Sequence, residues 1–387
     1  MDRHQQSTNR SDPVHQHLKI ALLTCGTVFA AGAAGAAPPP LATAGARVVA
    51  VAQAAQLAGE IAVADQGGPI FDRAWGLADR DARRSHRAGT RWLWASATKQ
   101  VTAVLVMKQV ETGRISLDGS IASYLSGFAG ASGDKVTVRQ LLQHTSGLPN
   151  PDDTLTDAGG VPGFYSETGA SIDEAARASG FCAGAPKSAP GAAFAYNNCD
   201  YLVLGAILER VSGRSYGALV DRDIAKPIAL RSLALSRDGR PHRGMATGYT
   251  TGGKRYPPVN VATFGAAGAL TGTAHDLVTL DRALVAGSLL SPASRAVLWQ
   301  GDPKLGFEAL GVWSFPARLA GCAAPVALVE RRGDVGGIQV RNVIAPDLGR
   351  SIAIFTNDDT VDFGEVWQGR GLSYDLLSAA FCAPFEP

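Results

Sequence analysis

Ser96 and Lys99 lie three positions apart at the start of an apolar segment. Residues at this spacing share one face of a helix, so the Lys99 amine can reach the Ser96 hydroxyl. Serine is a weak nucleophile until a base takes its proton, and burial lowers the pKa of a lysine so that it can act as a neutral base. The pair therefore predicts a nucleophilic serine at a helix N-terminus. Taken alone, an N-cap serine and a surface lysine explain the two residues equally well.

The same S-x-x-K spacing occurs again at Ser132 and Lys135, where the intervening Gly-Asp pair favours a solvated turn. The Ser96 copy differs because the apolar segment 92–95 precedes it and apolar residues recur at helical spacing as far as Val110. Since apolar residues nearly surround the axis, this pattern predicts a buried helix from Ser96 onward.

Tyr196 and Asn198 form a second candidate element. A tyrosine hydroxyl beside a lysine ammonium loses or shares its proton more readily, so Tyr196 is a candidate to take the serine proton and return it to a leaving group. The Asn198 amide is a candidate partner for both Lys99 and a substrate amide. Taken alone, a strand-end tyrosine followed by loop asparagines is the simpler interpretation.

A third candidate element begins with two cations, Arg331 and Arg332, and continues through Gly333 and Asp334. Either arginine is a candidate for bidentate binding of a substrate carboxylate. Glycine on a strand edge allows a substrate backbone to approach closely. The backbone N–H groups of Asp334 and Ser96 are candidates for an oxyanion hole. A glycine-rich hairpin turn with solvated arginines is the competing interpretation.

Together the three elements resemble the signature motifs of serine β-lactamases and DD-peptidases, in the same chain order. The tyrosine version is similar to class C β-lactamases, penicillin-binding proteins and their esterase, D-aminopeptidase and DD-carboxypeptidase relatives. The resemblance covers roughly residues 59–381. Further matching segments are Ala74-Trp75-Gly76-Leu77-Ala78-Asp79, Leu141-Leu142-Gln143-His144-Thr145-Ser146-Gly147-Leu148-Pro149, Pro190-Gly191, Phe194-Ala195-Tyr196, Leu204-Gly205, Gly265-Ala266-Ala267-Gly268 and Thr356-Asn357.

The resemblance implies an enzyme in which Ser96 is the nucleophile and Lys99 and Tyr196 share general-base work. Asn198 would touch the substrate. The implied reaction is hydrolysis of a β-lactam, a D-amino-acid peptide or a carboxylic ester through an acyl-Ser96 intermediate. Some relatives are penicillin-recognising binding or sensor modules with slow or no turnover, and this remains an alternative function.

The third motif departs from the family pattern. Where β-lactamases have Lys-Thr-Gly and many relatives have His in place of Lys, this chain has Arg331-Arg332-Gly333. A guanidinium does not shuttle protons, although it can bind a carboxylate. The departure puts efficient β-lactam hydrolysis in doubt and leaves acyl transfer intact.

The order of elements predicts an α+β fold of the β-lactamase/DD-peptidase type. An antiparallel sheet flanked by helices is built from both chain ends, about 46–90 and 301–383, around a mostly helical insertion, about 96–300. Strands are expected at 60–64, 69–77, 326–330, 338–345 and 351–357, and helices at 48–57, 137–144, 201–211, 274–286 and 372–381. The segment 151–193 is expected to be mostly loop.

Three residues are decoys or alternatives. Ser215 stands in a G-x-S-x-G pattern, the nucleophile elbow of α/β-hydrolases, but that elbow needs a strand before it and here a helix is expected. An esterase that uses Ser215 is nevertheless kept as a second alternative function. His144 and His275 are interpreted as structural residues near helix ends.

Composition narrows the function classes. The chain has 387 residues, 46% hydrophobic and 18% charged, with a net charge of +2, which suits a large folded core. It carries no concentrated basic stripe, so nucleic acid is not an expected partner. No metal or nucleotide motif is present, and no cofactor is expected. The expected partner is a small-molecule or peptide substrate, and the sequence carries no signal for an oligomeric state.

Residues 1–36 are expected to form a signal peptide. A polar stretch ends at Lys19, an apolar run follows, and Ala34-Gly35-Ala36 fits the A-x-A cleavage pattern. An uncleaved membrane helix is the alternative, but the run is rich in Ala and Gly and three prolines follow it. The mature chain is therefore expected in the periplasm or outside the cell, with no stable membrane span, a linker at 37–45 and one hydrolase domain at 46–383.

Signal cleavage removes Cys25 and leaves four cysteines. An even number in an exported protein permits two disulfides. Sequence proximity favours Cys182–Cys199, which leaves Cys322–Cys382 as the second bridge. Four buried free thiols remain the alternative.

Overall fold

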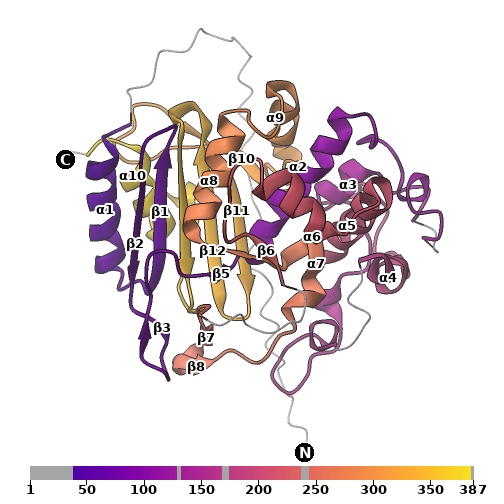
Figure 1. Cartoon of the computed structure of the whole chain (residues 1–387), viewed down its shortest axis with the longest axis horizontal. Helices are drawn as coiled ribbons and strands as arrows, with labels where there is room; N and C mark the ends of the chain where they lie inside the picture. The colour runs from indigo at the N-terminus through magenta and orange to yellow at the C-terminus, as the bar shows by residue number, and fades with distance from the viewer. Residues whose placement is uncertain (1–37, 129–131, 168–173, 237–243, 385–387) are drawn as a thin grey trace, which may run out of the picture. The chain divides into compact units, whose positions relative to one another are not determined.

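The centre of the fold is a six-stranded antiparallel sheet in the order β10-β11-β12-β13-β1-β2 (Figure 1). The computed structural model describes residues 38–128, 132–167, 174–236 and 244–384. The strands are β1 (Gly59–Asp65), β2 (Ile70–Trp75), β10 (Trp313–Ala317), β11 (Val326–Val335), β12 (Ile338–Ala345) and β13 (Arg350–Thr356). The first and last parts of the chain thus share one sheet, which confirms the predicted fold class.

Helices cover both faces of this sheet. Because side chains alternate along a strand, Ile61 and Val63 of β1 point to one face and Ala62 and Ala64 to the other. The first face packs against α1 (Leu41–Ala54) and α10 (Leu372–Phe381) in one apolar cluster. The second face packs against α8 (Ala274–Val285), where the small Ala62 and Ala64 side chains let the helix approach.

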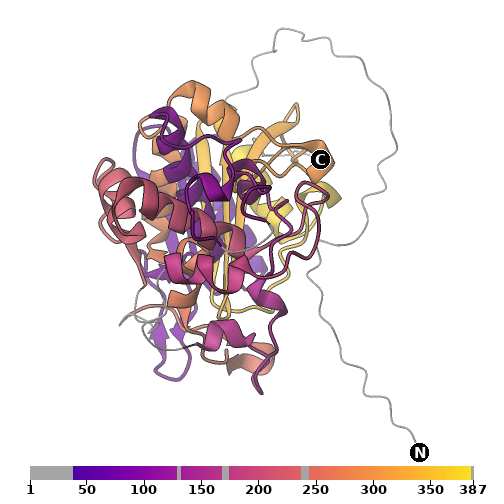
Figure 2. The same cartoon turned by 90° about the vertical axis from the view of Figure 1, so that its right-hand side faces the viewer.

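The chain between β5 and β10 forms the mostly helical region, which faces the viewer in Figure 2. Its helices are α2 (Thr98–Glu111), α3 (Val138–Leu142), α4 (Glu174–Ser179), α5 (Asn198–Ser212), α6 (Tyr216–Leu219), α7 (Gly265–Gly268) and α9 (Pro292–Leu298). Short strands join it: β3 (Leu77–Asp79) with β4 (Arg84–Ser85), β5 (Trp92–Leu93) with β9 (Leu270–Gly272) and β6 (Ala234–Leu235), and β7 (Tyr249–Thr250) with β8 (Lys254–Arg255). Nearly every residue of α2 is buried, as its apolar surface predicted.

Several predicted boundaries differ from the structure. Helix α1 begins at Leu41, inside the expected linker 37–45, and α5 begins at Asn198 rather than at residue 201. Helix α8 packs on the sheet, although the sequence placed it in the helical insertion. Strand β11 continues to Val335, beyond the expected end at residue 330. The segment 151–193 contains only α4 and short 3₁₀ turns among its described residues.

The described residues between 38 and 384 belong to a single compact unit. The expected signal peptide at 1–36, with Cys25, lies outside the described residues. Among the helices that the structure does describe, none combines the length and the apolar character that crossing a bilayer requires.

Asp281 of α8 predicts how stability depends on pH. Its carboxyl is buried and accepts hydrogen bonds from Gln100 (3.1 Å) and Asn342 (2.8 Å). Burial raises its pKa from 3.8 to about 7. Because the folded-state pKa lies above the unfolded one, stability falls as pH rises through this window, by on the order of 4 kcal/mol when both states are ionised.

We therefore expect Asp281→Asn to raise the thermal midpoint relative to the parent protein, and to raise it more at pH 8 than at pH 5. Asp118→Asn is the control, because Asp118 is exposed and should give no pH-dependent gain. A midpoint difference for Asp281→Asn that is the same at both pH values would contradict the assignment.

Candidate active site

Ser96 lies in a 3₁₀ turn, Ala95–Ala97, between β5 and α2. Ala95 adopts φ +47°, a left-handed conformation that costs a non-glycine residue about 1 kcal/mol or more. This bend presents the Ser96 side chain, which stays partly exposed, at the start of the buried helix. Lys99 lies in the first turn of α2, fully buried, and its Nζ is 3.2 Å from Ser96 Oγ, as the spacing predicted.

The second element lies against the first. Tyr196 places its hydroxyl 2.5 Å from Ser96 Oγ, and Asn198 Oδ1 accepts a hydrogen bond from Lys99 Nζ at 2.6 Å. Asn197 caps α5 by accepting the backbone N–H of Cys199 at 2.8 Å, so Asn198 is the first helical residue and its side chain is held in the site. The local reason is the preference of asparagine for the N-cap position.

Three oxygen atoms lie within hydrogen-bond distance of Lys99 Nζ. Its Nζ also donates to the carbonyl of Ala267 at 2.8 Å. Two of its three partners, that carbonyl and Asn198 Oδ1, are obligate acceptors. An ammonium would donate to all three partners, whereas a neutral amine has two N–H groups for the obligate acceptors and keeps one lone pair for the Ser96 hydroxyl. The geometry thus suits an amine that accepts the serine proton.

The electrostatics agree with this proton count. Burial holds the pKa of Lys99 well below its usual value, and the nearby Arg331 cation lowers it further, while Asp152, Asp200 and Glu308 oppose the shift. Burial raises the pKa of Tyr196, although Arg331 and the bond to Ser96 pull it back. Both shifts favour the uncharged forms, the neutral amine of Lys99 and the protonated phenol of Tyr196.

Arg331 is a buried cation inside the site wall. Its Nε donates to the Ser96 carbonyl at 3.1 Å, and its guanidinium carbon lies 5.2 Å from the Tyr196 ring centre and 5.0 Å from that of Trp313. Its nearest carboxylate contact is Glu308 at 3.9 Å, with both side chains fully buried. Because its guanidinium has no exposed surface, the arrangement does not provide the expected carboxylate-binding arginine.

The structure corrects the role predicted for Arg332. It pairs with Glu330 (2.8 Å) and Glu365 (2.6 Å), so its guanidinium is already held by two carboxylates. Alternation along β11 puts neighbouring side chains on opposite faces, and Arg331 is the one beside Tyr196. The expected carboxylate-binding role of Arg332 is therefore not available.

Gly333 has a different use from the expected one. A Cβ there would lie 2.8 Å from the Ser96 nitrogen and 2.9 Å from the Trp94 carbonyl oxygen, so only glycine lets β11 lie against the Ser96 turn. Among described residues, β10 pairs with β11 only as far as Glu330, which leaves residues 331–335 along that turn. Asp334, an exposed residue of this segment, follows Gly333 directly.

A buried polar pair supports Tyr196 from below. His144 lies at the end of α3, and its ring centre is 4.6 Å from that of Tyr196. Its Nδ1 is 3.0 Å from an Asp200 carboxyl oxygen and accepts the backbone N–H of Asn197 at 3.3 Å. Burial raises the pKa of Asp200 and lowers that of His144. Both shifts favour the neutral forms, and the buried His144 ring packs against Tyr196, as the structural interpretation of His144 expected.

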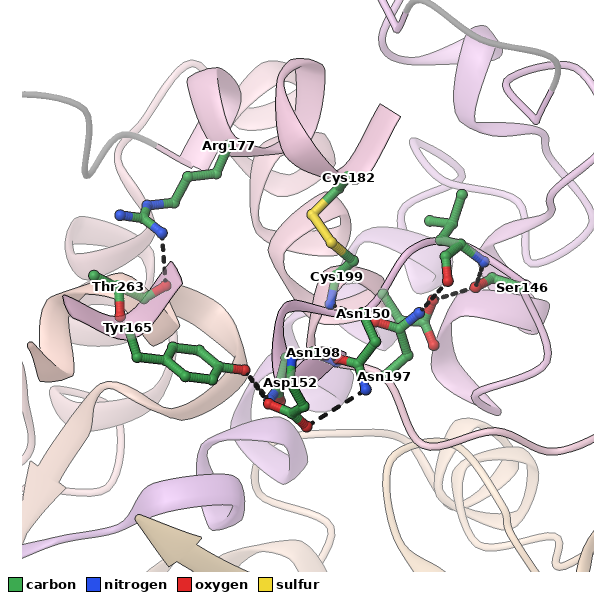
Figure 3. The surroundings of a disulfide bond; sticks show 12 residues. Ser146, Asn150, Asp152, Tyr165, Arg177, Cys182, Asn197, Asn198, Cys199 and Thr263 are labelled. Carbon is green, nitrogen blue, oxygen red and sulfur yellow. Dashed lines mark hydrogen bonds between the residues drawn. A yellow bond between two sulfur atoms is a disulfide. The ribbon is translucent and has the colours of Figure 1, made fainter. Parts of the chain in front are cut away.

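Two disulfides are present. Cys182 is bonded to Cys199, and Cys322 to Cys382, the pairing that sequence proximity favoured. The first ties the segment after α4 to the first turn of α5, next to Asn198 (Figure 3). It thereby fixes the loop beside the site to the helix that carries the site.

Sequence reasoning missed four groups of this site. The Ala267 carbonyl, in a segment noted only as a family match, holds Lys99. Glu308 is the buried carboxyl beside Arg331, and burial raises its pKa to about 8. Tyr165 donates to Asp152, and both side chains accept hydrogen bonds from Asn198 Nδ2 (Figure 3). No motif marks Tyr165 or Asp152, because they lie in the irregular segment 151–193.

The decoys lie elsewhere. Ser215 caps α6 and follows α5, so it lacks the strand that a nucleophile elbow requires. His275 is an exposed residue at the start of α8. Ser132 lies in a turn, as expected, but its side chain is buried rather than solvated. Within the described ranges, no group of three or more His, Cys, Asp and Glu side chains is placed to hold a metal.

The fold is of the penicillin-binding-protein type, and it carries a site built from serine, lysine and tyrosine. Residues 45–372 match the Beta-lactamase family, and the chain belongs to that family. Esterase EstB of Burkholderia gladioli is 37% identical over 191 residues, 46% of each chain, so the match spans about half of that relative.

Solved structures agree on the fold. A D-stereospecific amidohydrolase from Streptomyces sp. superposes with a TM-score of 0.69 at 25% identity, covering 89% of this chain and 99% of that one. A penicillin binding protein from Bacillus halodurans gives 0.68 at 23% identity, covering 86% and 98%.

The buried cation predicts a shift in the pH dependence of activity. Arg331→Met removes a positive charge that disfavours protonation of Lys99, so the pKa of Lys99 should rise. With neutral Lys99 as the predicted base, the acid limb of kcat/KM for p-nitrophenyl acetate should move to higher pH.

Arg331→Lys keeps the charge and should leave the limb near that of the parent protein. Arg332→Met is the matched control, since it removes the neighbouring cation that is paired with Glu330 and Glu365. An unmoved acid limb in Arg331→Met, or an equal shift in Arg332→Met, would contradict the assigned role.

Proposed function

We propose that this protein is a serine hydrolase that cleaves an ester or amide through an acyl-Ser96 intermediate. The observation that carries the proposal is the convergence on one hydroxyl: Ser96 Oγ lies 2.5 Å from the Tyr196 hydroxyl and 3.2 Å from Lys99 Nζ. Ser96 is partly exposed, whereas Lys99 is buried. A substrate can therefore reach the nucleophile while its base stays out of water.

In acylation, Ser96 Oγ forms a bond to the substrate carbonyl carbon and its proton passes to Lys99 Nζ. The backbone N–H groups of Ser96 and Asp334 are the proposed donors to the developing oxyanion. Burial disfavours the charged form of Lys99, so the ammonium readily gives up a proton. In this step the phenol proton of Tyr196 moves to the leaving group, and the Tyr196 oxygen receives a proton from Lys99. The carbonyl–leaving-group bond then breaks.

In deacylation the same groups act on water. Lys99 is neutral again after the leaving group departs, so it can take a proton from a water molecule that attacks the acyl carbon. The Ser96 oxygen leaves and regains its proton through Tyr196. A site that restores its base in this way is suited to turnover rather than to a stable acyl adduct.

The cations of the third motif bear on the substrate. Arg331 is fully buried and Arg332 is paired, so neither presents a guanidinium for a substrate carboxylate. This favours esters or amides that lack a carboxylate near the scissile bond over β-lactams. The matched part of esterase EstB, 37% identical, supports ester cleavage.

We expect Ser96→Ala to lower kcat/KM for p-nitrophenyl esters by about 10³-fold or more, because no other nucleophile takes its place. A fluorescent fluorophosphonate should label the parent protein on Ser96 only, as peptide mass mapping would show.

Ser215→Ala is the control and should keep full activity. Normal turnover by Ser96→Ala would sink the proposal. Labelling of Ser96 by a fluorescent penicillin with no measurable turnover of any ester or amide would instead support a binding or sensor module.

We also propose that the chain is exported to the periplasm or secreted after removal of residues 1–36. Two disulfides support an oxidising compartment. Intact mass of protein purified from periplasm or medium should show both bridges and an N-terminus near residue 37. Recovery of the uncleaved chain with free thiols from the cytosol would argue against export.

A further inference from the structure

Glu308 is a buried carboxylic side chain beside the active site, and none of the steps proposed for acyl transfer uses it. Neither of its carboxyl oxygens has a hydrogen-bond partner among the residues that the structure describes. Its ionic contact within those ranges is Arg331, whose Nη1 lies 3.9 Å from Glu308 Oε1. Because a carboxyl without a partner is costly to bury, the contact with Arg331 is the one that compensates the burial of Glu308.

The segment that carries Glu308 packs closely on the helices that carry the site. The backbone N–H of Asp302 donates to the Glu308 carbonyl at 3.0 Å. Three residues further on, Gly311 has φ +78°, and a Cβ there would lie 2.5 Å from the Tyr201 hydroxyl and 3.2 Å from the Lys99 carbonyl oxygen. Only glycine suits both the conformation and the space. The backbone of Glu308 is therefore held at a fixed place beside the site.

Arg331 links Glu308 to the reacting groups. Its Nε donates to the Ser96 carbonyl at 3.1 Å, and its guanidinium carbon lies 5.2 Å from the centre of the Tyr196 ring. The Ser96 turn includes the left-handed residue Ala95, so a hydrogen bond to the Ser96 carbonyl helps to hold a conformation that the backbone alone disfavours. A displaced guanidinium would therefore release both the Ser96 turn and one contact of the Tyr196 ring.

We infer that Glu308 is a positioning residue for the reaction at Ser96, because it keeps the Arg331 guanidinium against the Ser96 carbonyl and the Tyr196 ring. The inference rests on the proposed acyl-Ser96 chemistry and adds to it a residue that touches neither the substrate nor the reacting atoms. A buried guanidinium that loses its carboxyl partner is drawn toward other acceptors or toward solvent. Glu308 and Arg331 thus act as one unit in placing the nucleophile and the tyrosine.

The test uses Glu308→Met, which removes the polar atoms and keeps a similar volume. On the plateau above the acid limb, kcat/KM for p-nitrophenyl acetate should fall by about tenfold or more, because small displacements of reacting groups are costly. The rate at which a fluorescent fluorophosphonate labels Ser96 should fall by a similar factor, since it depends on the same hydroxyl. Glu308→Gln keeps an acceptor oxygen for Arg331 and should recover most of both rates.

Dependence on Arg331 is tested by combining substitutions. Arg331→Met alone should also lower the plateau, and adding Glu308→Met to it should change kcat/KM by no more than about twofold, because the residue through which Glu308 acts is already absent. The double variant removes both buried charges together, so neither is left without its partner. Glu365→Met is the matched control, since it removes a carboxylate partner of the neighbouring Arg332 and should leave both rates near the parent values.

Other outcomes overturn the inference. Full plateau activity in Glu308→Met would refute it, and so would a change confined to the position of the acid limb, which would mean that Glu308 acts on Lys99 through charge alone. Multiplying losses in the double variant would show that Glu308 acts without Arg331, and an equal loss in Glu365→Met would indicate a general weakening of β11. If Glu308→Met fails to fold, the comparison of the double variant with Arg331→Met decides. All these results leave Ser96-dependent turnover standing, whereas normal turnover by Ser96→Ala would refute the proposed function itself.

Discussion

The burial of one amine governs this site. Lys99 lies in the first turn of a helix that is buried on all sides, and a charged ammonium there would lose its hydration. Its neutral form is the one that the surroundings stabilise, since two acceptors take its N–H groups and a neighbouring guanidinium repels added positive charge. The start of the helix therefore places an amine that favours its neutral form beside the Ser96 hydroxyl.

Three separate parts of the chain come together around the buried Lys99 amine. The capped start of α5 brings Asn198 and Tyr196, α7 brings the Ala267 carbonyl, and β11 brings Arg331. Close contact between β11 and the Ser96 turn depends on the missing side chain of Gly333. The disulfide beside α5 adds a covalent restraint to the same assembly.

Buried and exposed charges both act on this site. Arg331 and Glu308 have no exposed surface, so a ligand cannot pair with either of them, yet both affect the pKa of Lys99. Asp152 is exposed, and it also opposes the lowering of the Lys99 pKa and raises the pKa of Tyr196. The protonation of the groups around Ser96 is therefore set by charges from several separate segments.

The sequence alone determined the elements whose signal is local. The S-x-x-K spacing, the apolar surface of α2 and the strands of β12 and β13 depend on neighbours within a few residues, and they were predicted with nearly correct bounds. Only the tertiary structure decided the rest. Alternation along β11 buried Arg331 and paired Arg332 with Glu365, although both arginines looked equivalent in sequence. Asp152 and Tyr165 came from an irregular segment without periodicity, and their place beside Asn198 depends on packing between residues distant along the chain. Periodicity reports how a residue sits on its own helix or strand, and it carries no information about which distant side chain will lie opposite.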